Sequence, residues 1–150
     1  MKYSSGKTGR VVVARLEDGD DIYECIECIA ATEKIDNAVI WIIGGMKNGG
    51  VVVGPETPVS MPPDVMIERF EEPREVLAVG TLFPAGENRP SLHLHAGMGR
   101  GRSPLVGCPR IAAECWLIDE VVVLEITGIN AARIKDPDCG LELLTLGPAA

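Results

Sequence analysis

EVLAVGTL at residues 75–82, followed by SLHLHA at residues 91–96, decides the fold that we expect for this chain. Both segments have the length and apolar pattern of strands, and turn-forming residues lie between them at 84–90. We therefore predict two neighbouring antiparallel strands joined as a hairpin. The second strand carries the only two histidines, His93 and His95. They would project from one face with Cβ atoms roughly 7 Å apart, within reach of one metal ion.

Other short apolar runs indicate further strands around this hairpin. They lie at residues 10–16, 38–43, 51–53, 105–108 and 120–126. The glycine-rich segment 44–50 predicts a turn that joins 38–43 to 51–53 as a second hairpin. Four prolines between Pro55 and Pro63 indicate a surface loop, because proline interrupts regular hydrogen bonding.

A single helix is predicted near the start of the chain. Ile22, Cys25, Ile26 and Ile29 follow the helical apolar spacing, and Asp20 or Asp21 can cap the first turn. Because helices do not alternate with strands, a Rossmann architecture is disfavoured. We expect one α+β domain over residues 1–150, with a mixed, mostly antiparallel, curled sheet of about seven strands and one main helix packed on it.

Composition limits the function classes. The net charge is −8 and the pI about 4.7, so direct binding to nucleic acid is disfavoured. No apolar run is long enough to span a bilayer, and residues 1–10 are polar rather than signal-like. Five cysteines without a secretion signal favour reduced thiols. We therefore expect a soluble, cytoplasmic protein.

Five motifs, taken in order, resemble the plant and prokaryote conserved domain, also called PPC or DUF296. They are RLEDGDDI at 15–22, EVL at 75–77 followed by Gly80-Thr81, HLH at 93–95, EVV at 120–122 and GLELL at 140–144. The resemblance covers nearly the whole chain. It implies a mixed-sheet fold that is also similar to that of acetolactate decarboxylase, and it implies a homotrimer.

The resemblance also implies a metal site, since some prokaryotic members hold a metal on the two strand histidines and a third histidine. At the third position this chain has Cys108, after Val106-Gly107. Zinc accepts imidazole and thiolate together, so His93, His95 and Cys108 could form a three-ligand site with a fourth position open. The alternative is that both histidines simply lie half-buried on a strand with ordinary hydrogen bonds.

Several weaker candidates accompany this predicted site. Arg100 and Arg102, on a glycine-rich loop, either contact a small anionic metabolite beside the metal or belong to a solvated turn. Glu75 and Glu120, at strand starts, are weak candidates for a general base. The Cys25-x-x-Cys28 pair is expected to lie in the helix, with Cys25 in its apolar stripe.

Three functions remain open from the sequence. The first is a trimeric zinc protein, with a possible lyase or hydrolase activity in which zinc polarises a carbonyl or activates water and Arg100 or Arg102 orients an anion. The second is a regulatory or assembly module of a DNA-binding family, without direct DNA contact, because the chain lacks the family's separate basic hook. The third is a structural trimer whose metal only joins strands.

Overall fold

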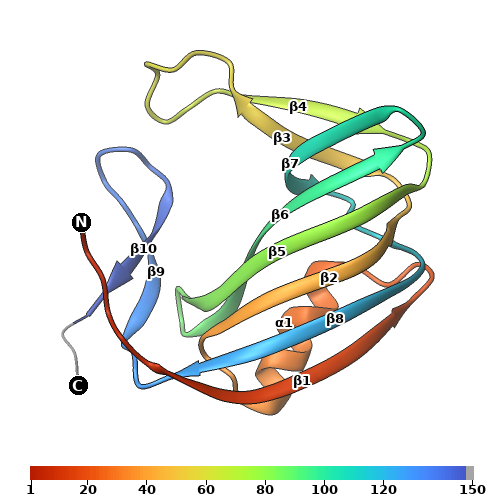
Figure 1. Ribbon diagram of the computed structural model, residues 1–150. Helices are drawn as coiled ribbons and strands as arrows, with labels where there is room; N and C mark the ends of the chain where they lie inside the picture. Colours follow the sequence, from red (N-terminus) through yellow and green to blue (C-terminus); the bar gives the residue numbers. More distant parts are fainter. Residues whose placement is uncertain (148–150) are drawn as a thin grey trace.

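The computed structural model describes residues 1–147, and these form ten strands and one helix (Figure 1). In chain order the elements are β1 (Lys7–Glu17), α1 (Ile22–Glu33), β2 (Ala38–Met46), β3 (Gly49–Pro55), β4 (Val65–Phe70), β5 (Arg74–Ala85), β6 (Arg89–Arg100), β7 (Ser103–Ile111), β8 (Cys115–Thr127), β9 (Ala131–Lys135) and β10 (Glu142–Leu146). The predicted class, a mostly antiparallel curled sheet with one helix, is confirmed, but the strands outnumber the seven expected.

The main sheet follows the order β1-β8-β2-β5-β6-β7-β3-β4. The predicted β5–β6 hairpin is confirmed, with Val79 opposite His95 and Thr81 opposite His93. The predicted hairpin between residues 38–43 and 51–53 is wrong. Strand β2 pairs with β5 and β8, while β3 pairs with β4 and β7. The glycine-rich segment therefore carries the chain away from the β2 ladder instead of folding it back on itself.

The short strands β9 and β10 form a separate ribbon at one end of β5, which it meets at the single pair Ala85 and Arg133. In Figure 1 the turn of this ribbon lies on the same side of the molecule as the loop between β3 and β4. Sequence patterns did not indicate β4, β9 or β10, because these strands are only five or six residues long and β4 and β10 are largely exposed.

Helix α1 covers one face of the sheet. Asp21 is its N-cap and accepts a hydrogen bond from the Glu24 amide at 2.9 Å. Ile22, Ile26 and Ala30 are buried against the sheet, which agrees with the predicted apolar stripe. Among residues 1–147, no helix is long and apolar enough to cross a membrane.

Candidate metal centre

Strand β6 separates the two histidines from the core. Leu92, Leu94 and Ala96 are buried in the core, and His93 and His95 point to the opposite face, as strand alternation requires. The two imidazole rings lie edge to face with centroids 5.1 Å apart. The predicted common projection is therefore present in the structure.

Cys108 comes from β7, where this strand leaves one partner and joins another. Gly107 still pairs with Ala96 of β6, while Cys108 pairs with Val52 of β3. A side chain at position 107 would collide with the Val52 carbonyl, so glycine allows β3 to close over β7 at this point. This crossing buries Cys108 and holds it next to the histidines.

The ligand atoms of His93, His95 and Cys108 all lie within 4.8 Å of one another. Zinc bonds of about 2.0–2.1 Å to nitrogen and 2.3 Å to sulfur, in tetrahedral geometry, require ligand separations of roughly 3.3–3.6 Å. The donor set, two imidazoles and one thiol, therefore fits zinc.

Arg110 and Tyr23 support the cysteine. The Arg110 Nε–H donates to the Cys108 sulfur at 3.1 Å, so the guanidinium holds this side chain in place beside the histidines. The Tyr23 hydroxyl, from α1, donates to the Pro109 carbonyl at 2.6 Å and fixes the residue between Cys108 and Arg110. Burial, followed by the nearby Cys108, raises the pKa of Tyr23, so this hydroxyl keeps its proton and remains a donor.

Electrostatics near His93 favour the form that binds metal. Partial burial, and then the positive charges of Arg133 and Arg110, lower the pKa of His93 below its ordinary value. A neutral imidazole has a lone pair free for a metal ion. His93 is therefore neutral at physiological pH before any ion arrives.

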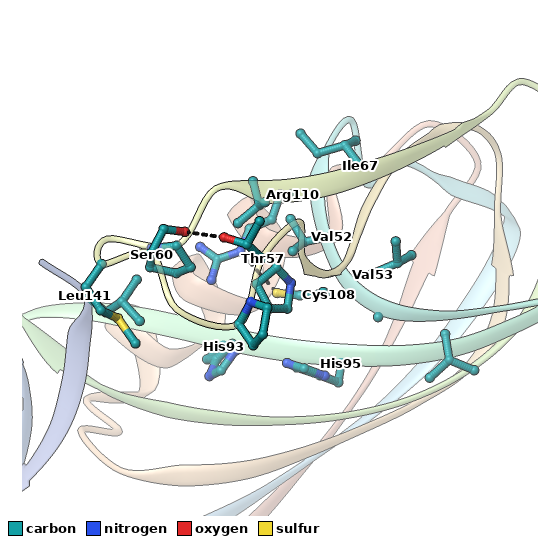
Figure 2. A pocket seen from close by; sticks show the side chains of 18 residues that line it. Val52, Val53, Thr57, Ser60, Ile67, His93, His95, Cys108, Arg110 and Leu141 are labelled. Atoms are coloured by element: carbon teal, nitrogen blue, oxygen red, sulfur yellow. Dashed lines mark hydrogen bonds between the residues drawn. The ribbon is translucent and has the colours of Figure 1, made fainter. Parts of the chain in front are cut away.

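A cavity of about 840 Å³ opens above the three residues (Figure 2). Its lining combines β3, β4, Leu141 and the proline-rich segment predicted as a surface loop. The Thr57 and Ser60 hydroxyls of that segment are joined by a 3.1 Å hydrogen bond. Apart from the candidate ligands and Arg110, most lining side chains are apolar, and the aliphatic ones include Val52, Val53, Val65, Ile67 and Val106. The loop thus forms a wall of the site.

The sequence matches the model of the Plants and Prokaryotes Conserved (PCC) domain over residues 3–127. The chain belongs to this family. The motifs at 15–22, 75–81, 93–95 and 120–122 fall within the matched region, so the resemblance found in the sequence is confirmed. A comparison with curated proteins found no match.

Solved structures establish the same fold. The metal-containing protein of Archaeoglobus fulgidus is 23% identical and matches with a TM-score of 0.83, over 97% of this chain and 99% of that one. The plant- and prokaryote-conserved protein of Pyrococcus horikoshii is 20% identical, with a TM-score of 0.82 and 97% of both chains covered. A "putative DNA-binding protein" of Bacteroides thetaiotaomicron is 23% identical, with a TM-score of 0.76 over 96% and 97%.

The two arginines singled out in the sequence lie elsewhere in this PCC domain. Arg100 ends β6, five residues beyond His95 and therefore about 17 Å along the strand. Its guanidinium pairs with Glu72 at 2.8 Å. Arg102 is exposed in the β6–β7 turn. The structure does not bring either arginine to the histidines, because the strand runs on past the site before it turns.

The remaining candidates are also separated from the cavity. Glu75 lies four residues before Val79 on β5, and Glu120 lies on β8 opposite Ile43; both are exposed. Cys25 packs against the core as predicted, and Cys28 is exposed on the same helix. None of these four residues lines the cavity above the histidines.

Sequence reasoning missed two residues of this PCC domain that do lie beside His93. Arg110 follows Cys108 by two positions, and a basic residue near a predicted ligand was a usable signal. Arg133 lies on β9, far along the chain, and its guanidinium donates to the Thr81 carbonyl at 3.1 Å and to the Thr81 hydroxyl at 2.9 Å. Nothing in its local sequence indicates this position.

Proposed function

We propose that this PCC domain is a cytoplasmic zinc-binding protein whose ligands are His93, His95 and Cys108. The observation that carries the proposal is the convergence of two imidazoles and a buried thiol within 4.8 Å. The name of the Archaeoglobus fulgidus protein, which describes that protein as metal-containing, supports it. Three protein ligands leave one coordination position, which faces the cavity and suits a ligand or substrate.

Several residues around the proposed zinc ion would have distinct roles. Zinc would supply Lewis-acid chemistry at the open position. Arg110 would orient the Cys108 sulfur through the hydrogen bond that it donates, Tyr23 would keep the intervening backbone in place, and the aliphatic walls would exclude bulk water. The described residues that line the main cavity include no carboxylate, so neither Glu75 nor Glu120 is placed to act there as a general base.

Metal content is the direct test of this function. Bound metal should be removed from the purified protein with a chelator, and the protein should then be reloaded with zinc at neutral pH. Its zinc content is measured by inductively coupled plasma mass spectrometry. We expect one zinc ion per chain, in competition with a chromogenic chelator of known affinity. Cobalt substitution adds a spectroscopic test, because a thiolate ligand gives an intense charge-transfer band. Zinc content well below one per chain after reloading would contradict the proposal.

We further propose that the domain forms a homotrimer through the sheet face opposite α1. One row of paired residues crosses the five strands β1, β8, β2, β5 and β6 on this face. In that order, it consists of Val13, Val122, Trp41, Val79 and His95. On this face an apolar patch collects six side chains that are 40–71% exposed, namely Val11, Val13, Trp41, Ile43, Leu77 and Val79. Contiguous exposed apolar surface of this kind marks an interface. Since Val79 faces His95, a docked copy would lie beside the metal site.

Introducing charge into the patch tests the assembly. We expect the wild-type chain to elute at three times its mass of 16.0 kDa in size-exclusion chromatography with light scattering. The Val13→Lys/Ile43→Lys double variant should elute as a monomer, because two buried, unpaired lysines would oppose association. Ile134→Lys, at an isoleucine outside the patch that is 54% exposed against 61% for Ile43, is the control and should remain trimeric. A wild-type monomer would contradict the proposal.

A second candidate function is a regulatory or assembly module without direct DNA contact. The apolar patch favours it, since the same surface could bind a partner, and the name of the Bacteroides thetaiotaomicron protein places DNA binding among the functions considered for this fold. The net charge of −8 opposes contact with phosphate backbones. In a gel-shift assay at near-physiological salt we expect no retarded duplex; salt-dependent retardation would overturn this expectation.

A further inference from the structure

Two arginines beside His93 lack carboxylate partners. Among the described residues, no Asp or Glu oxygen lies within 4.0 Å of the guanidinium nitrogens of Arg110 or Arg133. Arg133 is 9% exposed, and its Nε is buried without a hydrogen-bond partner. A buried guanidinium without a counter-ion is costly in a folded protein unless a ligand compensates it.

Both arginines face one cavity. Arg110 and Arg133 line a cavity of about 450 Å³ together with His93 and Leu141. His93, Arg110 and Leu141 also line the 840 Å³ cavity above the candidate metal ligands, so the two spaces adjoin. Glu142 lies in the lining of the smaller cavity, but its one charge is outnumbered by the two guanidinium groups.

This arrangement selects a negatively charged group. Each guanidinium can donate two parallel hydrogen bonds to a carboxylate, and such charge-assisted bonds are about twice as strong as neutral ones. The chain has a net charge of −8, yet at this place two guanidinium groups face one cavity beside the proposed metal position. A ligand bound to the metal in the larger cavity could therefore extend to the two arginines in the adjoining smaller cavity.

The aliphatic wall restricts the rest of that ligand. Figure 2 shows Val52, Val53 and Ile67 on the side of the larger cavity across from the histidines. An inorganic anion has no apolar part, so these aliphatic side chains would remain exposed to water when it binds. A carboxylate that carries an aliphatic chain would bury it, with about 0.8 kcal/mol gained for each CH₂ group fully removed from water.

We propose that Arg110 and Arg133 form the anion subsite for a small aliphatic carboxylate, whose hydrocarbon body lies in the Val52, Val53 and Ile67 cavity. The subsite replaces the one predicted at Arg100 and Arg102. It deepens the proposed function and rests on it for the metal at the cavity floor. The arginine pair itself acts with or without the ion.

Calorimetric titration with hexanoate tests the subsite in both metal-free and zinc-loaded protein. We expect hexanoate to bind at least about tenfold more tightly than acetate, because its longer chain reaches the aliphatic wall. Hexylammonium has the same body with the opposite charge and should give no binding. Arg110→Gln and Arg133→Gln should each weaken hexanoate binding by about tenfold or more. Arg102→Gln is the matched control and should leave it unchanged.

The outcomes separate this subsite from the metal site. Zinc content is measured on every sample. Wild-type protein that takes up no zinc on reloading but binds hexanoate through both arginines would refute the metal and support the subsite. Zinc-loaded protein whose hexanoate affinity survives both arginine changes would overturn the subsite and leave the metal. Phosphate binding as tight as that of hexanoate would also overturn it. If Arg133→Gln does not fold, Arg110→Gln, at an exposed side chain, decides the question.

Discussion

His93→Ala is expected to lower the zinc affinity of this PCC domain by at least about a hundredfold, since loss of even an outer-shell partner costs 10–100-fold. His95→Ala and Cys108→Ala should have equal or larger effects, because each would leave only two protein ligands for an ion that needs at least three. Competition with a chromogenic chelator at fixed pH gives the affinities. Loss of any one of the three ligands should therefore weaken zinc binding strongly.

Matched variants make this experiment specific. Cys108→His places an imidazole where the family resemblance expects one, so it should retain zinc but lose the cobalt-thiolate band. Cys139→Ala removes another free cysteine that lies outside the cluster and should change neither signal. Full zinc binding by the His93→Ala protein would exclude this ligand set, and a cobalt-thiolate band in the Cys108→Ala protein would place the sulfur ligand elsewhere.

The part of this site that is local in sequence could be predicted. Alternation along β6 is enough to place His93 and His95 on one face, because a strand has a strict two-residue period. The β5–β6 hairpin follows from two adjacent apolar runs and a short turn. Cys108 required more, since its proximity depends on the pairing of β6 with β7. The family resemblance supplied that long-range information.

Features that depend on distant packing could not be predicted. Arg133 reaches His93 only because the β9–β10 ribbon docks at the end of β5, and neither short strand has a distinctive pattern. Arg100 was favoured because it is close in sequence to His95, but an extended strand carries five residues about 17 Å away. The hairpin expected between β2 and β3 does not form for a related reason. Glycines permit a turn, but the two edges of β2 are already paired with β5 and β8, which are distant in the sequence.

Asp119 is a buried carboxylate that no sequence pattern singled out. It lies on β8 between Leu16 of β1 and Gly44 of β2, and none of its surface is exposed. Neither carboxylate oxygen has a hydrogen-bond partner of good geometry among the described residues. Burial raises the pKa of Asp119 to about 6, although the Cys115 thiol and the Gly45 amide partly oppose this shift.

The wild-type protein should therefore lose stability relative to Asp119→Asn as the pH rises from about 4 to about 6. Below the ordinary pKa of 3.8, Asp119 is protonated in both the folded and the unfolded chain and costs nothing. Between the two pKa values the unfolded chain releases the proton and the folded chain retains it, so unfolding becomes more favourable. A shift of about two pKa units corresponds to roughly 3 kcal/mol, with a constant difference above pH 6.

Urea unfolding of both proteins from pH 4 to pH 8, with a chelator present to remove any metal contribution, measures this difference. Carboxylates with lowered pKa values, such as Glu125 beside Arg10, change stability in the opposite direction, but they are common to both proteins and cancel. The buried amide of the variant adds an offset that does not depend on pH. Only the slope between pH 4 and pH 6 therefore reports on the Asp119 proton. Parallel stability curves for the two proteins would mean that Asp119 is ionised at its ordinary pKa despite its burial.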